Sequence, residues 1–327
     1  NLMSNKCAVC YVTDINYLLP SIISATTLRR YIKPDDASVF IYVVDTDDAQ
    51  VQAINKTLRP LAIELHHLDS THYGDIDINK YKQSHVPLAA VGRFFLSDVL
   101  PEHFEHIVYI DGDTWIPSDP SALIKASIPE GKFAAAEDTL HLQQHNSCSG
   151  SAKKIRQYYK DLGVNIKNGY FNSGVFAVSR QTWKQISKEA YDYLVNNLDV
   201  CTHHDQSALN AVVGDRRLRL SCAWNFQTPY KYLNIEQKIT PKIYHFSKPL
   251  KPWMGPIIPW QEIHPEYTKL VQQYREFNLP LKMVDEEMIT RYNKRAEKKL
   301  IFGKMPLLPD ITRSYMGFNR FEKQAVL

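Results

Sequence analysis

Two aspartates separated by one glycine, Asp111 and Asp113, follow directly after an apolar run at residues 107–110. The run predicts a buried strand. Side chains two positions apart on an extended backbone point to the same face, so the two carboxylates are expected side by side where the strand ends. Like charges this close repel each other unless a cation lies between them. Mg²⁺ and Mn²⁺ bind carboxylates together with phosphate oxygens, so the pair predicts a metal–diphosphate site.

An ordinary turn is the alternative explanation, because Asp and Gly are common in turns that follow strands. The glycine-rich motifs that usually hold phosphates are missing from the sequence: no GxGxxG follows the first apolar run, and no GxxxxGK[ST] occurs. A nucleotide bound by this chain therefore needs another source of positive charge, which favours the metal interpretation.

Short apolar runs alternate with stretches of helical spacing around this motif. Strands are predicted at residues 7–12, 39–44, 62–68, 107–110, 133–137, 170–179, 219–223 and 242–245, and helices at 18–31, 48–58, 85–100, 151–162, 181–197 and 207–213. This alternation is typical of an α/β protein with a parallel sheet covered on both faces. Ligands of such sheets bind beyond the carboxyl ends of the strands. Thr13 and Asp14 also follow a strand, so we expect them near the aspartate pair.

The composition is that of an ordinary globular protein. The chain has 327 residues, of which 44% are hydrophobic, enough for one large domain or two smaller ones. No apolar run reaches the roughly 18 residues needed to span a bilayer. The given sequence does not start with a basic segment followed by a long apolar core, so we expect no secretory signal.

The cysteines do not form a disulfide pattern. There are five, and they are scattered along the chain. Cys7 and Cys10 have CxxC spacing, but they lie in an apolar run where residues three apart face opposite ways. We interpret them as buried thiols rather than as a metal or redox pair, and expect a cytoplasmic protein.

Basic residues gather near the carboxyl end, although the net charge of the chain is only +4. Residues 287–301 place apolar side chains at helical spacing with basic residues between them. Such a segment suits peripheral contact with an anionic membrane, for example the inner face of the cell membrane, or a solvated helix packed on the protein. Nucleic-acid binding is not expected, because no aromatic RNA-binding signature accompanies the basic residues.

Several pieces of the sequence resemble, in order, the retaining glycosyltransferases of family 8, a group that includes bacterial lipopolysaccharide galactosyl- and glucosyltransferases and glycogenin. The pieces are TDINY, GRFFLSDVLP, YIDGDTWI, GYFNSGVFAVS, HHDQSALN, WNF and YHFSKPLKPW. The resemblance implies a GT-A fold, a Rossmann-like mixed sheet flanked by helices, in residues 1–250. Residues 251–327 would form a partly helical extension. It also implies a UDP-hexose donor, usually UDP-glucose or UDP-galactose, and Mn²⁺, with Mg²⁺ as the alternative ion.

The resemblance also implies a set of donor-binding residues. They are Thr13, Asp14, Asn16, Tyr17, Arg93, Asp111, Gly112, Asp113, Asn172, Lys248 and Lys251. Asp14, Asn16 and Tyr17 would hold the uridine, and Ile15 stands where the family often has a second acid. Arg93 would reach the diphosphate or the donor sugar, and Lys251 would bind the leaving diphosphate. Lys248 replaces a glycine that is common in the family, and either adds a cation near the phosphate or blocks its approach.

The implied metal ligands are Asp111, Asp113 and His245. Carboxylates with one imidazole suit Mn²⁺ better than Mg²⁺. A core histidine capped by a backbone carbonyl is the alternative for His245, but the neighbouring KPLKPW and the upstream DGD favour the metal.

The remaining residues carried over from the family surround the sugars. Asn172 and Asp205 would bind hydroxyl groups of the donor sugar, Gln206 would sit near the anomeric carbon, and Asp138 would face the acceptor. An amide oxygen is a poor nucleophile, so we favour front-face transfer over a covalent intermediate. The expected catalytic residues are therefore Asp205 and Gln206, acting with fixed positive charge on the leaving diphosphate.

The expected reaction is transfer of glucose or galactose to a saccharide or glycolipid acceptor in lipopolysaccharide or another surface glycan. A non-catalytic protein that binds a UDP-sugar and a self-glucosylating enzyme like glycogenin are the alternatives. A phosphatase of the haloacid-dehalogenase type also has two aspartates near a strand end, but its order is DxDGT, whereas this chain has DGDT.

Overall fold

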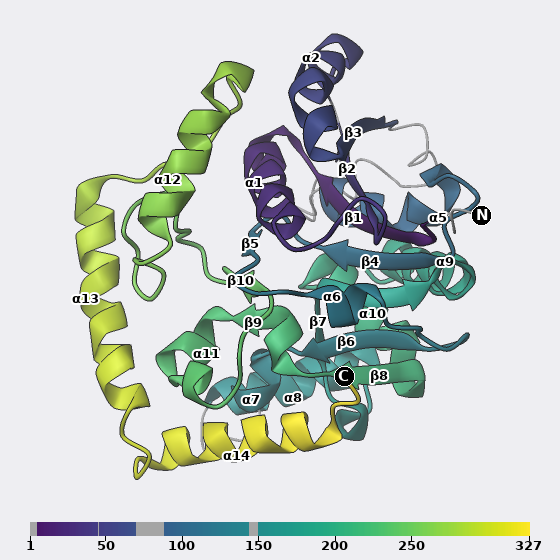
Figure 1. Ribbon diagram of the computed structural model, residues 1–327. Coiled ribbons are helices and arrows are strands. Elements are labelled where there is room, and N and C mark those ends of the chain that lie inside the picture. The colour runs from purple at the N-terminus through teal and green to yellow at the C-terminus, as the bar shows by residue number, and fades with distance from the viewer. Residues whose placement is uncertain (1–4, 45, 70–87, 144–149) are drawn as a thin grey trace.

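The computed structural model describes residues 5–44, 46–69, 88–143 and 150–327. Its centre is a seven-stranded sheet with the order β3-β2-β1-β4-β7-β6-β8 (Figure 1). The strands are β1 (Cys7–Thr13), β2 (Ser38–Val44), β3 (Ile63–Leu68), β4 (His106–Ile110), β6 (Phe133–Glu137), β7 (Phe171–Ser179) and β8 (Arg217–Leu220). The predicted α/β class and the mixed, helix-flanked sheet are thus confirmed.

One strand runs against the others. β7 is antiparallel to both β4 and β6, whereas the remaining pairs in the sheet are parallel. The wholly parallel sheet predicted from the strand–helix alternation is therefore wrong at β7. The reversal brings the first residues of β7 to the edge where β4 and β6 end, and the Asp111 amide donates to the Gly174 carbonyl over 2.7 Å.

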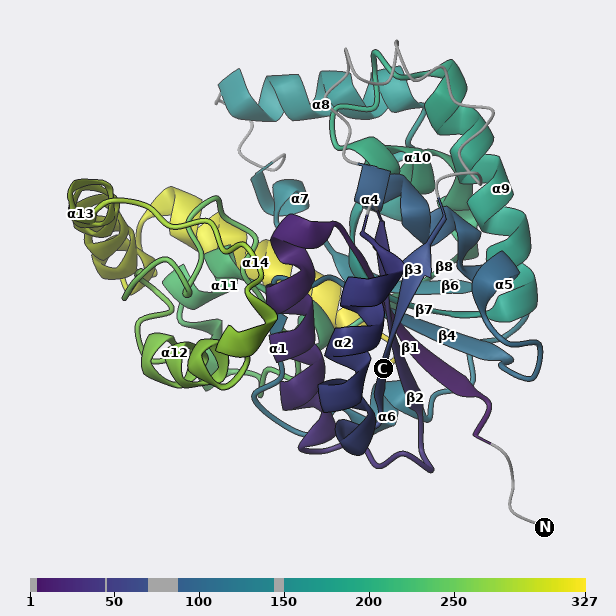
Figure 2. The ribbon, with the colours of Figure 1, turned by 90° about the horizontal axis from the view of Figure 1, so that it is seen from above.

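Helices cover both faces of the sheet (Figure 2). On one face lie α1 (Leu18–Arg29) and α2 (Asp48–Leu58), and on the other α8 (Gly150–Leu162), α9 (Arg180–Asn196) and α10 (His204–Val213). Alternate strand residues supply the two cores, so Val9 packs in one and Ala8 in the other. Cys7 and Cys10 likewise fall in opposite cores and are buried free thiols, as predicted.

Some predicted boundaries shift. Of the helix expected at residues 85–100, positions 85–87 lie outside the described residues, and the rest is divided into α4 (Leu88–Gly92), a 3₁₀ turn η4 (Arg93–Phe95) and α5 (Leu96–Val99). The strand expected at 219–223 is β8, which ends at Leu220, because Ser221 accepts the Ala223 amide and starts the turn η7 (Cys222–Asn225). The strand expected at 242–245 shrinks to β10 (Tyr244–His245).

A second, three-stranded sheet stands beside the aspartate motif. Its order is β5-β10-β9, with β5 (Thr114–Trp115) antiparallel to β10 and β9 (Phe226–Gln227) parallel to it. Short helices flank this region: α6 (Ser121–Ile124), α7 (Leu140–Gln143) and α11 (Thr228–Tyr232). The small sheet thereby joins the loop after β4 to residues far along the chain.

The carboxyl-terminal residues form α12 (His264–Gln273), α13 (Glu286–Gly303) and α14 (Pro309–Gln324). The predicted amphipathic segment 287–301 lies within α13. α14 packs onto the end of the sheet: Phe318 and Phe321 are buried, and Glu322 accepts hydrogen bonds from the Ser221 hydroxyl and the Cys222 amide, each 2.7 Å long. Among the described residues, the helices are all too short or too polar to cross a bilayer.

Candidate active site

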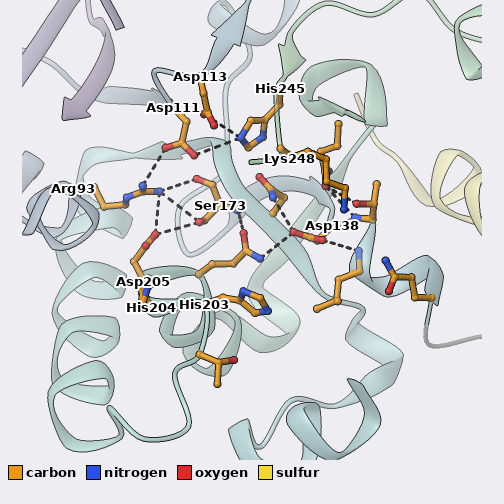
Figure 3. A pocket seen from close by; sticks show the side chains of 18 of the residues that line it. Arg93, Asp111, Asp113, Asp138, Ser173, His203, His204, Asp205, His245 and Lys248 are labelled. Atoms are coloured by element: carbon orange, nitrogen blue, oxygen red, sulfur yellow. Dashed lines mark hydrogen bonds and ion pairs between the residues drawn. The ribbon is translucent and has the colours of Figure 1, made fainter. Parts of the chain in front are cut away.

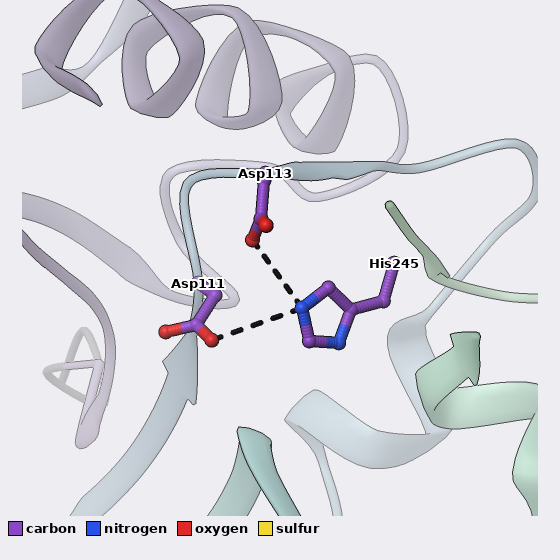
Figure 4. A group of neighbouring side chains, drawn as sticks. All are labelled: Asp111, Asp113 and His245. Atoms are coloured by element: carbon purple, nitrogen blue, oxygen red, sulfur yellow. Dashed lines mark ion pairs between the residues drawn. The ribbon is translucent and has the colours of Figure 1, made fainter. Parts of the chain in front are cut away.

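Asp111, Asp113 and His245 meet beyond the end of β4 (Figure 4). Asp111 follows β4 directly, and the β5–β10 pairing sets His245 opposite Thr114, the residue after Asp113. The His245 Nε2 atom lies 3.3 Å from Asp113 Oδ1 and 3.9 Å from Asp111 Oδ2. One possible ligand atom from each residue lies within 4.8 Å of the other two. The three side chains expected to bind a metal are therefore brought together.

A buried asparagine orients the imidazole. The His245 Nδ1 atom is 2.9 Å from the side-chain oxygen of Asn225. The side-chain nitrogen of Asn225 donates to the side-chain oxygen of Asn172 over 2.8 Å. Because the Asn225 oxygen can only accept, Nδ1 carries the hydrogen. The lone pair of a neutral imidazole then lies on Nε2 and faces the carboxylates. This is the arrangement in which histidine usually binds a metal.

The surroundings fit a hard divalent ion. A Cβ atom on Gly174 would fall 2.7 Å from Asp111 Oδ2 and would collide with the His245 ring, so only glycine leaves this space open. Two carboxylates and one imidazole are a donor set that suits Mn²⁺. The remaining ligands would come from substrate phosphate oxygens.

The charges of the group affect its protonation. Burial lowers the pKa of His245, but the charges of Asp113 and Asp111 outweigh it, so this pKa lies above its ordinary value. Burial raises the pKa of Asp113, but the positive charges of Lys251 and His245 are stronger and lower it far below its ordinary value. A proton on His245 therefore balances part of the negative charge of the two carboxylates, as a bound metal ion would.

Arg93 joins the metal site to the first turn of α10. Its guanidinium contacts Asp111 Oδ1 and Asp205 Oδ2, each at 3.1 Å, and donates to the Ser173 carbonyl at 3.0 Å. The guanidinium also lies over the Tyr109 ring, 4.2 Å from its centroid. This buried arginine is thus held on several sides with one edge toward the pocket.

Gln206 has a fixed amide. Its oxygen accepts the Ser173 backbone N–H over 3.0 Å, and its nitrogen donates to Asp138 Oδ2 and to the Tyr170 hydroxyl at 3.0 and 3.3 Å. Asp138 Oδ2 also accepts from the Asn172 nitrogen at 2.8 Å. A chain of hydrogen bonds therefore runs from His245 through Asn225, Asn172 and Asp138 to Gln206. Figure 3 shows His245 and Asp138 among the side chains that line the pocket.

Lys251 lies beside the metal group. Its ammonium contacts Asp113 Oδ2 at 2.8 Å and donates to the Phe246 carbonyl. The side chain is buried. A fixed cation thus stands directly beside the three possible metal ligands.

These residues line a pocket of about 450 Å³. Of the expected site residues, it includes Arg93, Asp111, Asp113, Asp138, Asn172, Asp205, Gln206, His245, Lys248 and Lys251. His203 and His204 also line it, and His203 stands at the N-cap of α10 without a capping hydrogen bond from its side chain.

The expected uridine residues lie outside this pocket. Asp14 caps the turn η1 (Ile15–Tyr17) by accepting the amides of Asn16 and Tyr17. Asn16 and Tyr17 line a neighbouring cavity of about 420 Å³ together with Trp253. Burial and, to a lesser extent, the charge of Asp113 raise the pKa of Tyr17 to about 12. Tyr17 therefore lies close enough to Asp113 to be affected by its charge.

Thr13 and Gly112 contact other parts of the protein chain. Thr13 is buried and donates to the Asp14 carbonyl. A Cβ on Gly112 would lie 3.3 Å from the Ser21 Cα and would collide with the Ser21 hydroxyl, so glycine is needed where the loop after β4 crosses α1.

Sequence reasoning gave no role to several residues that hold the site together. All of them lie inside motifs quoted above, so the sequence marked their positions but not their contacts. They are Asn225, Tyr109, Ser173 and Tyr170. Their partners come from other elements, and the contacts become visible only when these elements are packed together.

Comparison with known proteins agrees with this geometry. A model of the family described as glycosyl transferase family 8 matches residues 8–255. Lipopolysaccharide glucosyltransferase WaaO of Escherichia coli K12 is 25% identical over 259 residues, covering 75% of this chain and 72% of that protein. General stress protein A of Bacillus subtilis is 28% identical over 201 residues, which are 55% of this chain and 65% of that protein.

Solved structures share the fold. The galactosyltransferase LgtC, solved with donor and acceptor sugar analogues, superposes with a TM-score of 0.62 at 18% identity, covering 86% of this chain and 98% of that chain. The glycosyltransferase GlyE of Streptococcus pneumoniae gives a TM-score of 0.57 at 18% identity, covering 86% and 67%. The GT-A fold is thereby confirmed. With a family match over most of its length, the chain belongs to glycosyl transferase family 8 and is a glycosyltransferase related to those of lipopolysaccharide synthesis.

Proposed function

We propose that the protein transfers a hexose, glucose or galactose, from a UDP-sugar to a saccharide acceptor of lipopolysaccharide or another surface glycan, with Mn²⁺ and with retention of configuration. The observation that carries the proposal is the convergence of Asp111, Asp113 and His245 with the cations Arg93 and Lys251 at one pocket. The names of WaaO and LgtC, a glucosyltransferase and a galactosyltransferase, support the choice of hexose.

The donor would lie across the two adjoining cavities. Its uridine would occupy the cavity of Asn16, Tyr17 and Trp253, and its sugar the pocket lined by Asn172 and Asp205. The diphosphate would then pass between the cavities, beside Asp113 and Lys251.

Transfer requires stabilisation of the charge that develops on the departing diphosphate. A bound Mn²⁺ would act as a Lewis acid on the phosphate oxygens. The buried Lys251 adds a fixed cation, and its contact with the Phe246 carbonyl holds it in place. Charges preorganised in this way stabilise a transition state without reorganisation during the reaction.

We favour front-face transfer. A double displacement needs a nucleophile below the sugar, and Gln206, the residue that we expect near the anomeric carbon, is a hydrogen-bonded amide and a poor nucleophile. The Asp205 carboxylate is paired with Arg93 and accepts the Ser173 hydroxyl, which makes it a weak nucleophile. The acceptor proton would then pass to the leaving phosphate, and Gln206 would orient the sugar.

The carboxyl-terminal helices supply a surface suited to a membrane. Large apolar side chains are exposed around the turn between α13 and α14, among them Leu307, which is 94% exposed, and Ile301 and Phe302. Lys298 and Lys304 stand among them. We place peripheral contact with an anionic membrane, on its cytoplasmic face, at this turn.

Two assays together test the proposal. We expect UDP-glucose or UDP-galactose to raise the thermal midpoint in the presence of Mn²⁺, and slow hydrolysis of that donor to follow. Binding without any hydrolysis or transfer would favour a non-catalytic sugar-binding protein instead. A lack of any response to UDP-sugars with Mn²⁺ would contradict the proposed donor.

A further inference from the structure

A second cleft opens from the edge of the donor pocket. It has a volume of about 300 Å³ and shares Thr139, Gln143 and Lys248 with that pocket. Its other walls come from α7, α11 with the residue that follows it, α13 and α14. The last two helices lie beyond residues 8–255, so the part of the cleft that they build is specific to the carboxyl-terminal part of this chain.

The walls of the cleft are mostly apolar. Leu142, Leu233, Phe302 and Ile311 line it. Phe302 is 51% exposed and continues into the apolar turn between α13 and α14. The cleft thus leads from the donor pocket toward the surface that we place at a membrane.

Two lysines stand at the mouth of the cleft. Lys248 is partly buried, and Lys299, on α13, holds its ammonium 5.6 Å from the centroid of the Tyr232 ring. Burial lowers the pKa of Lys248 and the charge of Lys299 lowers it further, whereas the charge of Asp138 raises it, so Lys248 is acted on by one like and one opposite charge. In the part of the chain that the structure describes, neither lysine forms a direct ion pair. Two neighbouring cations that lack a direct carboxylate contact favour an anionic ligand between them.

We propose that this cleft is an acceptor subsite, and that the acceptor is a saccharide with an anionic substituent, phosphate or carboxylate, held by Lys248 and Lys299 next to an apolar group. The inference rests on the proposed function, since it needs the adjoining pocket to hold the donor. The features that carry it are the continuity of the two cavities and the two lysines that line the cleft without a direct ion pair in the described part of the chain. The anionic substituent would sit beside the sugar that receives the hexose, with the apolar group toward Phe302.

The test compares sugars that differ only in charge. The full-length protein, loaded with UDP and Mn²⁺ to fill the diphosphate region, is titrated with phenyl β-glucoside, phenyl β-glucoside 6-phosphate and phenyl β-glucuronide by ligand-observed NMR. We expect at least one anionic glycoside to bind roughly fivefold to tenfold more tightly than the neutral one. The stronger of the two anionic ligands distinguishes a phosphate from a carboxylate.

Lys299→Gln is the decisive variant, with Lys298→Gln as its matched control. Both remove one charge from α13, but only Lys299 lines the cleft. We expect the preference for the anionic sugar to fall to twofold or less, on the order of a single weak charge contact, in K299Q and to persist in K298Q. UDP affinity should be the same in all three proteins.

Other outcomes separate the two proposals. Equal binding of neutral and anionic glycosides, no binding of either anionic one, or a preference that survives in K299Q would overturn the acceptor subsite. A failure of UDP to bind with Mn²⁺ would instead count against the proposed function. In that case the preference for the anionic glycosides, and its dependence on Lys299, can still be measured by the same titrations.

Discussion

The Nδ1–H of His245 donates a hydrogen bond of 2.9 Å to the side-chain oxygen of Asn225, and this bond turns Nε2 toward Asp111 and Asp113. Residues that orient a metal-binding histidine are often nearly as important as the ligands. Asn225 itself is held by the Asn172 oxygen. It therefore links the metal group to the sugar pocket.

Replacing Asn225 by alanine should lower Mn²⁺ affinity roughly 10- to 100-fold, because the imidazole loses its tautomer and its orientation. Electron paramagnetic resonance of free Mn²⁺ measures this directly. Asn55→Ala is the control: Asn55 is also a buried amide, bonded to the Leu65 backbone away from the site. Both variants should be less stable, but an equal loss of Mn²⁺ affinity in both would deny Asn225 an orienting role.

Mn²⁺ binding should release a proton at pH values below the pKa of His245. The pKa of His245 is raised in the folded protein above its ordinary value of about 6.5, because Asp113 and Asp111 outweigh the effect of burial. The proton must leave before Nε2 can bind a metal, so Mn²⁺ affinity should rise with pH until that pKa is passed. Calorimetric titrations in buffers of different ionisation enthalpy report the released proton. Identical heats in all buffers would show that His245 is already neutral.

Donor turnover should fall in acid because of Asp205. Burial raises the pKa of Asp205 to about 6, even though the charge of Arg93 opposes the rise. Below that pH the carboxyl is protonated and its ion pair with Arg93 is lost, so kcat/KM should drop about tenfold per pH unit at saturating Mn²⁺. The Asp205→Asn variant should be less active and lack this acid limb. Asp199→Asn, at an exposed neighbouring position, should keep the wild-type profile.

An unchanged acid limb of kcat/KM in D205N would assign the titration to another group.

The same carboxyl group affects the stability of the fold with the opposite dependence on pH. Its pKa is higher in the folded chain than in the unfolded one, so its contribution to stability decreases as pH rises from about 4 to 6.

Leu307→Asp should weaken binding to vesicles that contain anionic lipid roughly tenfold, since an exposed leucine of this kind contributes by entering the interface. Sedimentation with vesicles measures the partition. Met283→Asp is the control, because Met283 is 57% exposed but precedes α13. Equal partitioning of the wild type and both variants would end the membrane proposal for the turn between α13 and α14.

Local patterns predicted most of the strands, because several of them are short apolar runs that are buried on both faces, as residues 107–110 are. The direction of β7 was not predictable in this way. It depends on how β7 pairs with β4 and β6, which are distant in sequence. The break of the predicted helix at Arg93 directly follows Gly92, the last residue of α4, but a single glycine inside a helical pattern is only a weak signal of a helix end.

The aspartate pair was recognisable because both ligands lie on one strand end. His245 came from the family resemblance alone, and the contact is made by the short β5–β10 pairing. Asn225 escaped notice because its role depends on the turn η7 meeting β10. Lys248 was noted as a departure from the family, but its neighbour Lys299 becomes apparent only when α13 packs beside the pocket.

The central claim is that Asp111, Asp113 and His245 hold one divalent ion to which the donor binds. The most direct measurement is UDP binding by calorimetry with and without Mn²⁺, in the wild type and in Asp113→Asn. We predict one Mn²⁺ per chain, UDP affinity that rises at least tenfold with the ion, and loss of that increase in D113N. UDP that binds equally well without Mn²⁺, or an increase that survives in D113N, would contradict the account.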